Sequence, residues 1–532
     1  MEDFMSKISR MIGLVFVAAL MLGGTLHAQG WYVMGAVGAS SQFNVWGVAA
    51  YYGLDAPVHV WSGKSMGGIT DSRAGVPLQT GNLWVAWSTS TNKTAFYLSV
   101  DSTVGVRAMY AMPRTTLYLD GGIAGHKKDK LIEGLGVGVV EDDYLPAAAI
   151  AAITGQQFTV GFSELRPEDA KMATARTLAE YGYFGSGIGN LIQSSISTST
   201  VRAIDFNISG NDPISGQAVP AYSTLPVGAN SILVFVNDTQ TGAGHLGQRV
   251  NGAPVFQDII RPQLTGFVDG SWSLTRDVNM DGTLPAVNTT TFVREPLSGT
   301  YNTFEFAVPN VAGIRHSQED GRTTEPFNQA SLGGGFRKRV IGTGEMTGST
   351  GVAGANDAIG YAFWGFGNFK TCMTPTGNPA ANPCRYLTVD GVEPLQDSSN
   401  YGFFPFGWNF VTHKALRRGD YPIWGMYYAM LSNPNDPFFV WMTQVADFVV
   451  GNYPEYADWT TLKVFKSHYN PDLVSGLAPI FPGSVPHNGI AAGAPAEWGG
   501  TVAGQTYGRS TETDFYNNSV APIHQELTNR VR

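Results

Sequence analysis

The segment PVGANSILVFVN, residues 226–237, constrains the fold more than any other part of the chain. Its apolar residues run on without polar alternation, which is typical of a strand buried on both faces. A second apolar stretch, DAIGYAFWGFGNF at 357–369, predicts another buried strand, and TTTFV at 289–293 predicts a shorter one. Strands of this kind need helices packed on both sides of their sheet. The pattern therefore favours an α/β fold.

Two segments supply the expected helices. RPEDAKMATARTLAEYGYF at 166–184 has a proline and acidic residues at its start, and NGAPVFQDIIRPQLTG at 251–266 predicts a short helix with a turn. Only 14% of the 532 residues are charged, while 65 are glycine and 29 are proline. This composition is too apolar for a disordered chain and too rich in glycine and proline for a helical bundle. The length suits two or three domains, and in α/β sheets ligands bind beyond the carboxyl ends of the strands.

The N-terminus predicts export. Lys7 and Arg10 precede the apolar stretch MIGLVFVAALMLGGTL at 11–26, and a small residue, Ala28, follows at the expected cleavage point. The alternative is an N-terminal membrane anchor, but the apolar stretch is shorter than the ~20 residues that span a bilayer. We expect residues 1–28 to be a cleaved signal peptide, and the mature protein to lie in the periplasm or outside the cell without being integral to a membrane.

The chain contains two cysteines, Cys372 and Cys384, which flank a loop rich in Pro, Gly and Asn. In an exported protein this arrangement predicts a local disulfide, worth about 3 kcal/mol in the chain-entropy model. A metal-binding pair is the alternative, but no histidine lies within ten residues of either cysteine. We expect the disulfide.

The stretch REPLSGT at 294–300 concentrates groups that favour an anion. Arg294 offers a planar fork of donors, Ser298 and Thr300 add hydroxyls, and Gly299 lets a ligand approach the backbone closely. A helix beginning at Thr300 would point its free N–H groups at the same spot. The alternative is an ordinary turn before a helix, with Arg294 paired to its neighbour Glu295.

Three other segments have similar chemistry. Ser186 lies between glycines in YFGSGIGNLIQSS, Asp212 follows a short predicted strand in IDFNISGNDPISG, and Gln42 and Phe43 end the loop GASSQF. Each also has a structural interpretation. Ser186 can be a turn residue, Asp212 before Pro213 is a common turn opener, and Phe43 can be part of a packed core.

In this order, the segments resemble the phosphate-binding proteins of bacterial ABC transporters, the PstS-like class of periplasmic binding proteins. REPLSGT matches that family's R-x-x-x-S-G-T, and GASSQF is similar to its N-terminal G-A-x-x-T-F loop. GSGIGNLIQ is similar to the family's G-S-G-G-G-I-K-Q, and DFNISGND to its D-F-G-A-S-D. Weaker similarities continue through VFQDIIRPQLTGFVDGSW, GSTGVAGANDAIGYAFW, YLTVDGVEP and GDYPIWGMYY.

The resemblance implies a two-lobed periplasmic-binding-protein-like fold of type II. One lobe would combine residues 29–230 with 352–532, and the other would span 231–351. The segment from about 54 to 160 would be a large insertion, and the chain beyond about 430 a C-terminal extension, because the family needs far fewer residues there.

The resemblance also implies a ligand and its contacts. Phosphate or a similar tetrahedral oxyanion would be captured between the lobes for an ABC importer, without a cofactor or metal. Asp212 would accept the proton of the phosphate, and Gln42 stands where the family has threonine. The implied phosphate ligands are Arg294, Ser298, Gly299, Thr300, Ser186, Asp212, Gln42 and Phe43, the last through its backbone N–H.

Other functions are less well supported. Asp101 beside Ser102 in LSVDSTVG is similar to the nucleophile of metal-dependent phosphatases, but the nine histidines are scattered and no two lie within five residues. We therefore expect no enzyme and no catalytic residues. A net charge of −9 gives no support to nucleic-acid binding. The remaining alternative is a surface structural, adhesion or filament-forming protein built on the same scaffold.

Overall fold

The computed structural model describes residues 32–174, 205–309, 318, 328–396, 411–431, 455–458, 501–502 and 505–506. Short gaps in these ranges lie at 55–57, 72–75, 134, 136–137, 168, 172, 280, 332–333, 371, 374–382 and 419. The predicted signal peptide, most of the predicted C-terminal extension and Ser186 lie outside the described residues.

The chain forms a mixed α/β structure. Its longer strands are β1 (Tyr32–Ala39), β2 (Val58–Asp71), β3 (Val76–Ser88), β4 (Lys93–Val100), β5 (Thr116–Leu119), β6 (Val160–Ser163), β7 (Ser223–Asn237), β11 (Thr290–Val293), β13 (Phe336–Arg339), β14 (Ala358–Phe363) and β17 (Trp424–Leu431). The shorter strands are β8 (Arg249–Val250), β9 (Ala253–Pro254), β10 (Asp258–Ile259), β12 (Asn328–Ala330), β15 (Cys384–Tyr386), β16 (Thr388–Val389), β18 (Ala457–Asp458), β19 (Thr501–Val502) and β20 (Gln505–Thr506).

The α-helices are α2 (Phe43–Gly53), α3 (Ser102–Tyr110), α4 (Ala147–Ile153), α8 (Arg261–Asp269), α9 (Gly299–Ala307), α10 (Gly342–Thr347), α11 (Phe366–Phe369) and α12 (Lys414–Arg418). Single 3₁₀ turns are η1 (Ser40–Gln42), η2 (Thr275–Val278) and η4 (Val352–Gly354). In the part of the chain that the structure describes, no helix has the length and apolar character needed to cross a membrane.

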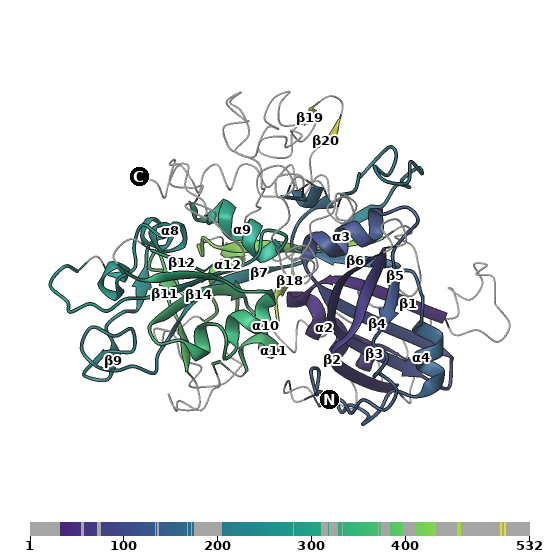
Figure 1. The fold of residues 1–532 in the computed structure, drawn as a ribbon, viewed down its shortest axis with the longest axis horizontal. Helices are drawn as coiled ribbons and strands as arrows, with labels where there is room; N and C mark the ends of the chain where they lie inside the picture. The colour runs from purple at the N-terminus through teal and green to yellow at the C-terminus, as the bar shows by residue number, and fades with distance from the viewer. Residues whose placement is uncertain are drawn as a thin grey trace.

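Two lobes lie side by side in Figure 1. The lobe with purple and blue elements contains β1 to β5 with α2 and α3, and the teal and green lobe contains β11 and β14 with α8 to α10 (Figure 1). One mixed sheet of 14 strands runs through both lobes in the order β12-β13-β11-β14-β7-β17-β6-β1-β4-β3-β2-β5, with β15 and β18 also pairing with β7. The predicted two-lobed α/β fold is confirmed.

Strand β7 joins the two lobes. Its first half pairs antiparallel with β17, from Ser223↔Leu431 to Ser231↔Trp424. Its second half pairs with β14 and β15, which belong to the other lobe. The side chains of Ile232 through Val236 are completely buried, so this part of β7 is covered on both faces, as its continuous apolar sequence predicted.

The first lobe is built on a parallel core. Strand β1 pairs in parallel with β4 along its whole length and with β6 on its other side. The long antiparallel hairpin of β2 and β3 extends this core, and Asn92, with a positive φ of 51°, closes the turn between β3 and β4. Asparagine adopts this left-handed conformation at lower cost than most residues.

Strand pairing differs from two details of the predicted lobe division. The range 54–160 was expected to be an insertion, but β4 and α3 within it belong to the parallel core beside β1. The predicted second lobe ended at residue 351, but β14 at 358–363 pairs with β11 and with the second half of β7. Within that range, the hairpin of β2 and β3 and the strand β5 that pairs with β2 are antiparallel additions to the parallel core, joined to it through the pairing of β3 with β4.

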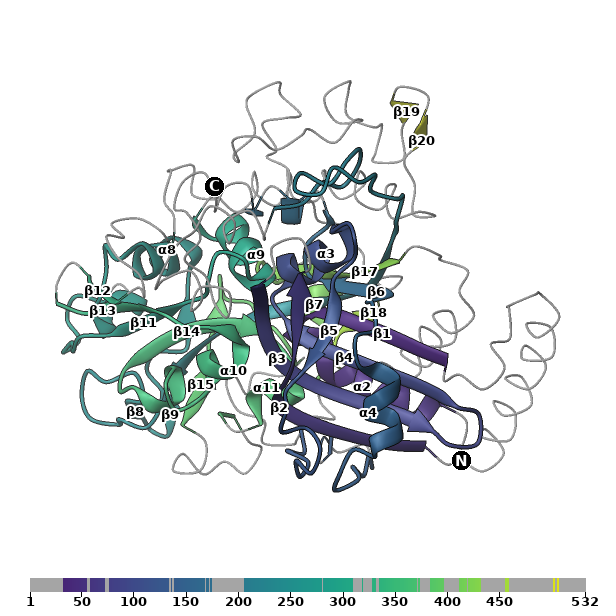
Figure 2. The same cartoon turned by 45° about the vertical axis from the view of Figure 1, so that its right-hand side comes forward.

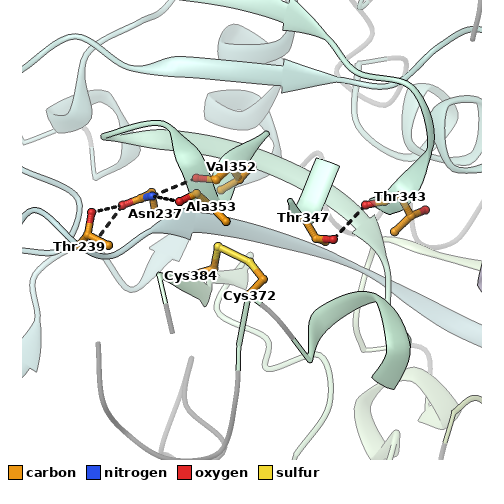
Figure 3. The surroundings of a disulfide bond; sticks show 8 residues. All are labelled: Asn237, Thr239, Thr343, Thr347, Val352, Ala353, Cys372 and Cys384. Carbon is orange, nitrogen blue, oxygen red and sulfur yellow. Dashed lines mark hydrogen bonds between the residues drawn. A yellow bond between two sulfur atoms is a disulfide. The ribbon is translucent and has the colours of Figure 1, made fainter. Parts of the chain in front are cut away.

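The predicted disulfide between Cys372 and Cys384 is present, with the two Cα atoms 5.2 Å apart. Cys384 opens β15 opposite Asn237, at the end of β7 (Figure 3). The amide of Asn237 donates to the carbonyl of Val352, 3.0 Å away, and so ties the same strand end to the turn before β14. The disulfide therefore links Cys372 to β15, which pairs with the end of the central strand β7.

Candidate functional site

The stretch from β11 to α9 folds as a strand, a short loop and a helix, as predicted. Ser298 caps the helix, because its backbone is extended and its hydroxyl accepts a hydrogen bond from the N–H of Tyr301 at 3.4 Å. Serine is among the residues that stabilise a helix start best. The helix begins at Gly299, one residue before the expected Thr300.

Arg294 is buried at the carboxyl end of β11. Its guanidinium donates to both carboxylate oxygens of Glu295, with Nη2 2.7 Å from Oε1 and Nε 2.9 Å from Oε2. The remaining nitrogen, Nη1, donates to Thr343 Oγ1 at 3.0 Å and, more weakly, to Thr300 Oγ1 at 3.5 Å. The pairing with Glu295 is the alternative that the sequence left open. Arg294 is thus paired with Glu295 and at the same time lies beside Thr300.

Arg294 and Glu295 each stabilise the charged form of the other. Burial disfavours the charged form of Glu295, but the Arg294 guanidinium outweighs it and holds the pKa of Glu295 below its ordinary value. Burial likewise opposes the charge on Arg294, but Glu295 and then Asp101 raise its pKa. Both residues therefore stay ionised, and together they form a neutral buried unit.

A second carboxyl, Glu164, faces this pair from the other lobe. It follows β6 and is completely enclosed by protein. The hydroxyl of Ser41 donates to Oε1 at 2.5 Å, and the hydroxyl of Ser102 donates to Oε2. Burial, the largest influence, raises the pKa of Glu164, and the hydrogen bonds from Ser102 and Ser41 offset this only in part.

Two helix starts from different lobes meet at Glu164. Helix α3 begins at Ser102, and α9 begins at Gly299. A Cβ atom on Gly299 would overlap Glu164 Oε2 and lie 2.5 Å from Ser102 Oγ, so a glycine is needed for the approach of the two elements. The two helices are neighbours at the junction of the lobes in both Figure 1 and Figure 2.

Further contacts close the junction between the lobes. Asp101 Oδ1 lies 3.8 Å from Arg294 Nη2, and Thr103 Oγ1 donates to the carbonyl of Leu297 at 2.7 Å. The hydroxyls of Ser40 and Thr343 lie 3.2 Å apart. Asp101 is also fixed within its own lobe, because Gln79 Nε2 donates to Asp101 Oδ2 at 3.2 Å.

The predicted loop GASSQF contributes differently from the expectation. Gln42 is buried and its Nε2 donates to the carbonyl of Ser163 at 3.2 Å. The N–H of Phe43, the predicted donor, already bonds to the carbonyl of Ser40, and the Phe43 ring lies in the core. Ser41, which the sequence did not single out, supplies the hydroxyl that reaches Glu164.

Asp212 lies away from this cluster. Its carboxylate accepts hydrogen bonds from the N–H groups of Ile214 and Ser215, both at 2.8 Å, and of Met112 at 3.1 Å. Met112 follows the C-terminal end of α3, whereas Ser102 begins that helix. A nine-residue helix is about 13 Å long, so Asp212 is separated from Glu164 by the length of α3. Asp212 is thus a turn residue in the structure, which is the alternative that its position before Pro213 suggested.

Sequence reasoning missed Glu164, Ser41, Thr103, Gln79 and Thr343. It noted Asp101 and Ser102, but only as similar to a phosphatase nucleophile. A signal existed for Glu164, because GFSE at 161–164 places an acid directly after a short apolar strand. In the described part of the chain, no group of three or more His, Cys, Asp or Glu residues is arranged to hold a metal ion.

No protein-family model matches the chain, and no curated protein matches it. Among solved structures, the chain is similar to a phosphate-binding protein from Stenotrophomonas maltophilia, with 11% identity, a TM-score of 0.34, and 81% of this chain and 91% of the other covered. It is also similar to PstS from Borrelia burgdorferi, with 9% identity, a TM-score of 0.31, and coverage of 79% and 92%.

A third similar structure is an ABC-type phosphate transport receptor from Vibrio cholerae, with 13% identity, a TM-score of 0.26, and coverage of 46% and 76%. These TM-scores are too low to carry an argument about function.

Proposed function

We propose that the chain is an exported binding protein that holds a protonated tetrahedral oxyanion, first of all phosphate, between its two lobes. The observation that carries the proposal is the meeting of α3 and α9 at Glu164, beside the buried Arg294. Helix starts present a positive dipole end, which favours an anion. The hydroxyls of Ser41, Ser102 and Thr300 add neutral donors around the same place.

The role proposed for Glu164 is to accept the proton of the ligand. A carboxylate is repelled by a fully ionised oxyanion, but it is a good acceptor for the P–OH group of hydrogenphosphate. Such a site prefers phosphate and arsenate to sulfate, because sulfate offers no proton at neutral pH. Glu164 thus takes the role that the sequence resemblance implied for Asp212.

Binding requires the lobes to separate first. Gly299 is in direct contact with Glu164 and Ser102, so an anion can reach the helix starts only when the junction opens. The ABC importer as partner and the periplasm or cell exterior as location rest on the sequence resemblance and on the predicted signal peptide. No bond is made or broken in this role, so it is not enzymatic.

Calorimetric titration of the mature protein with phosphate, arsenate and sulfate tests the proposal. We expect binding of the first two and weak or no binding of sulfate. Glu164→Gln should weaken phosphate binding by about ten- to hundredfold, the usual worth of a hydrogen bond to a charged group, and should narrow the preference over sulfate. Arg294→Lys should also weaken binding, because an ammonium keeps the charge but loses the fork.

Two control substitutions sharpen the test. Asp212→Asn should leave phosphate affinity unchanged if Glu164 is the acceptor, and should weaken it if Asp212 is. Glu141→Gln removes another buried carboxyl, one that accepts from Ser62 at 2.9 Å and from backbone N–H groups, and should also leave affinity unchanged. A parent protein that binds none of the three anions would overturn the proposal. Self-association of that protein, measured by light scattering, would then favour the structural or adhesion alternative.

A further inference from the structure

The hydroxyls of Ser40 and Thr343 face each other across the junction between the lobes, with their oxygens 3.2 Å apart. Ser40 begins η1 in the first lobe, and Thr343 lies in α10 of the second lobe. The side chain of Thr343 is buried, whereas Ser40 is partly exposed. The pair thus extends from the buried junction to a side chain that solvent reaches.

Thr343 also bonds to Arg294, the residue proposed to hold the anion. Arg294 donates from Nε and Nη2 to the carboxylate of Glu295, and from Nη1 to Thr343 Oγ1 at 3.0 Å. The guanidinium of Arg339 lies against Arg294 and donates to its carbonyl at 3.2 Å. The Thr343 oxygen therefore contacts a charged donor of its own lobe and a hydroxyl of the other lobe.

The chemistry of a hydroxyl allows these contacts to change. A hydroxyl has two lone pairs and one hydrogen, which rotates to suit its acceptor. Thr343 accepts from Arg294 with one lone pair, so its O–H can donate at the same time. A hydrogen bond to an ionised acceptor is stronger than one between two neutral groups. An anion at the junction is therefore a better acceptor for each hydroxyl than the other hydroxyl is.

We propose that Ser40 and Thr343 are further ligand-binding residues, one from each lobe, whose hydroxyls exchange their bond to each other for bonds to the oxyanion. The inference rests on the proposed function and adds two contacts to its site. Since one hydroxyl comes from each lobe, the bound anion links the lobes in place of the direct bond. Neutral donors bond to any of the tetrahedral oxyanions, so the selection of a protonated one stays with Glu164.

The backbone around Thr343 is fixed independently of its hydroxyl. Within α10, Thr347 Oγ1 donates to the Thr343 carbonyl at 3.1 Å (Figure 3). The N–H of Gly342 donates to Glu295 Oε2 at 3.4 Å. Removal of the Thr343 hydroxyl therefore leaves the contacts that place α10. Thr347 is a matched control, because its hydroxyl bonds inside the same helix.

Calorimetric titration of the full mature chain with inorganic phosphate tests the inference. Thr343→Val keeps the shape of the side chain and removes its hydroxyl, and Ser40→Ala removes the hydroxyl of the other lobe. Each should weaken phosphate binding by about five- to tenfold, because a bond to an ionised group is lost and only a weaker neutral bond is offset. Thr343→Ser keeps a hydroxyl and should retain most of the affinity. Thr347→Val should leave the affinity unchanged.

The double variant of Ser40→Ala with Thr343→Val separates contact with the ligand from contact between the two residues. If each hydroxyl bonds to the anion, the loss of affinity in the double variant is at least the product of the two single losses. If the hydroxyls act only on each other, the double variant binds no more weakly than the weaker single variant. That second result would overturn the inference.

Failure of the inference and failure of the proposed function give different results. A parent that binds phosphate, with Ser40→Ala and Thr343→Val binding it as tightly or more tightly, overturns the inference and leaves the proposed function standing. A parent that binds no phosphate overturns both. Circular dichroism and thermal melts establish that each variant is folded. Ser40→Ala changes a partly exposed side chain, so it retains the test if Thr343→Val does not fold.

Discussion

Arg294 donates from Nε and Nη2 to the two carboxylate oxygens of Glu295, the next residue in the chain, and both side chains are buried. Adjacent residues meet in this way only because the loop after β11 turns Glu295 back into the protein. A buried ion pair contributes little net stability by itself, since its attraction mainly offsets the cost of removing two charges from water. Removing one partner is different, because the other charge is left buried and unbalanced.

Arg294→Ala should therefore lower the free energy of unfolding by about 3–5 kcal/mol. The double substitution Arg294→Met with Glu295→Leu removes both charges and should recover most of that loss. Urea denaturation followed by tryptophan fluorescence measures both values. A single variant as stable as the parent would show that Glu295 has another partner strong enough to replace Arg294.

Glu164 should make stability depend on pH. Its pKa is raised in the folded protein above the ordinary value of 4.5, so the folded state holds its proton more tightly than the unfolded chain does. Glu164 contributes its full stabilisation when the pH is below the ordinary pKa. This stabilisation is lost as the pH rises through the pKa of the folded state. Compared with Glu164→Gln, the parent should lose stability over that range in denaturation experiments at stepped pH.

Glu133 provides a control of opposite sign. Its pKa is lowered from 4.5 to about 2, first by the hydrogen bond from Lys128. Stability from this group is present above the ordinary value and is lost as the pH falls toward the folded one. Glu133→Gln should therefore be less stable than the parent at neutral pH and equally stable in strong acid. Equal pH profiles for the Glu164 and Glu133 variants would contradict both assignments.

At the level of elements, the start of α9 packs against the start of α3 through Gly299. The approach depends on a missing side chain rather than on an attractive pair, since a Cβ atom here would overlap Glu164. A second contact lies beside it: Thr103 Oγ1 in α3 donates to the carbonyl of Leu297, just before α9. The two lobes are thus joined by close backbone contact as well as by charge.

Gly299→Ala should destabilise the folded protein by about 1–3 kcal/mol, the usual cost of overpacking a buried contact, and should weaken phosphate binding. Gly344→Ala in α10 is the matched control, because a Cβ atom there meets nothing within 4 Å and alanine favours a helix. Thermal melts and phosphate titrations of both variants give the comparison. Equal behaviour of the two would mean that the lobes do not rely on the contact at Gly299.

On the scale of the whole molecule, β7 belongs to both lobes at once. Its first half pairs with β17 and its second half with β14 and β15. Between these halves, the N–H of Ile232 donates to the Ile423 carbonyl, just before β17. Both lobes need β7. If one lobe unfolds, β7 loses the hydrogen-bonding partners that this lobe supplies, and the other lobe is weakened as well.

We therefore expect the described lobes to unfold in a single cooperative transition. Differential scanning calorimetry should show one peak, with the calorimetric and van't Hoff enthalpies in agreement. Added phosphate should move that peak to higher temperature without splitting it, because a ligand of the folded state stabilises it by mass action. Two separate transitions would show that β7 retains one set of partners when the other is lost.

The sequence by itself determined those features that depend on interactions between residues close together along the chain. The continuous apolar residues of 226–237 predicted the central strand, Ser298 and its neighbours predicted a helix start after β11, and the spacing of Cys372 and Cys384 predicted their disulfide. Each prediction depends on burial periodicity, helix capping or loop closure within a dozen or so residues. The resemblance to binding proteins added the two lobes.

Tertiary structure alone decided which residues meet Arg294. Asp212 and Glu164 each follow a short predicted or observed strand, so a position after a strand does not show which of them reaches Arg294. Pairing of β1 with β4 and β6 brings Ser41, Ser102 and Glu164 together from loops more than sixty residues apart along the chain. The register of a parallel sheet is set by long-range hydrogen bonds and packing, so the composition of the site could not be read from any single segment.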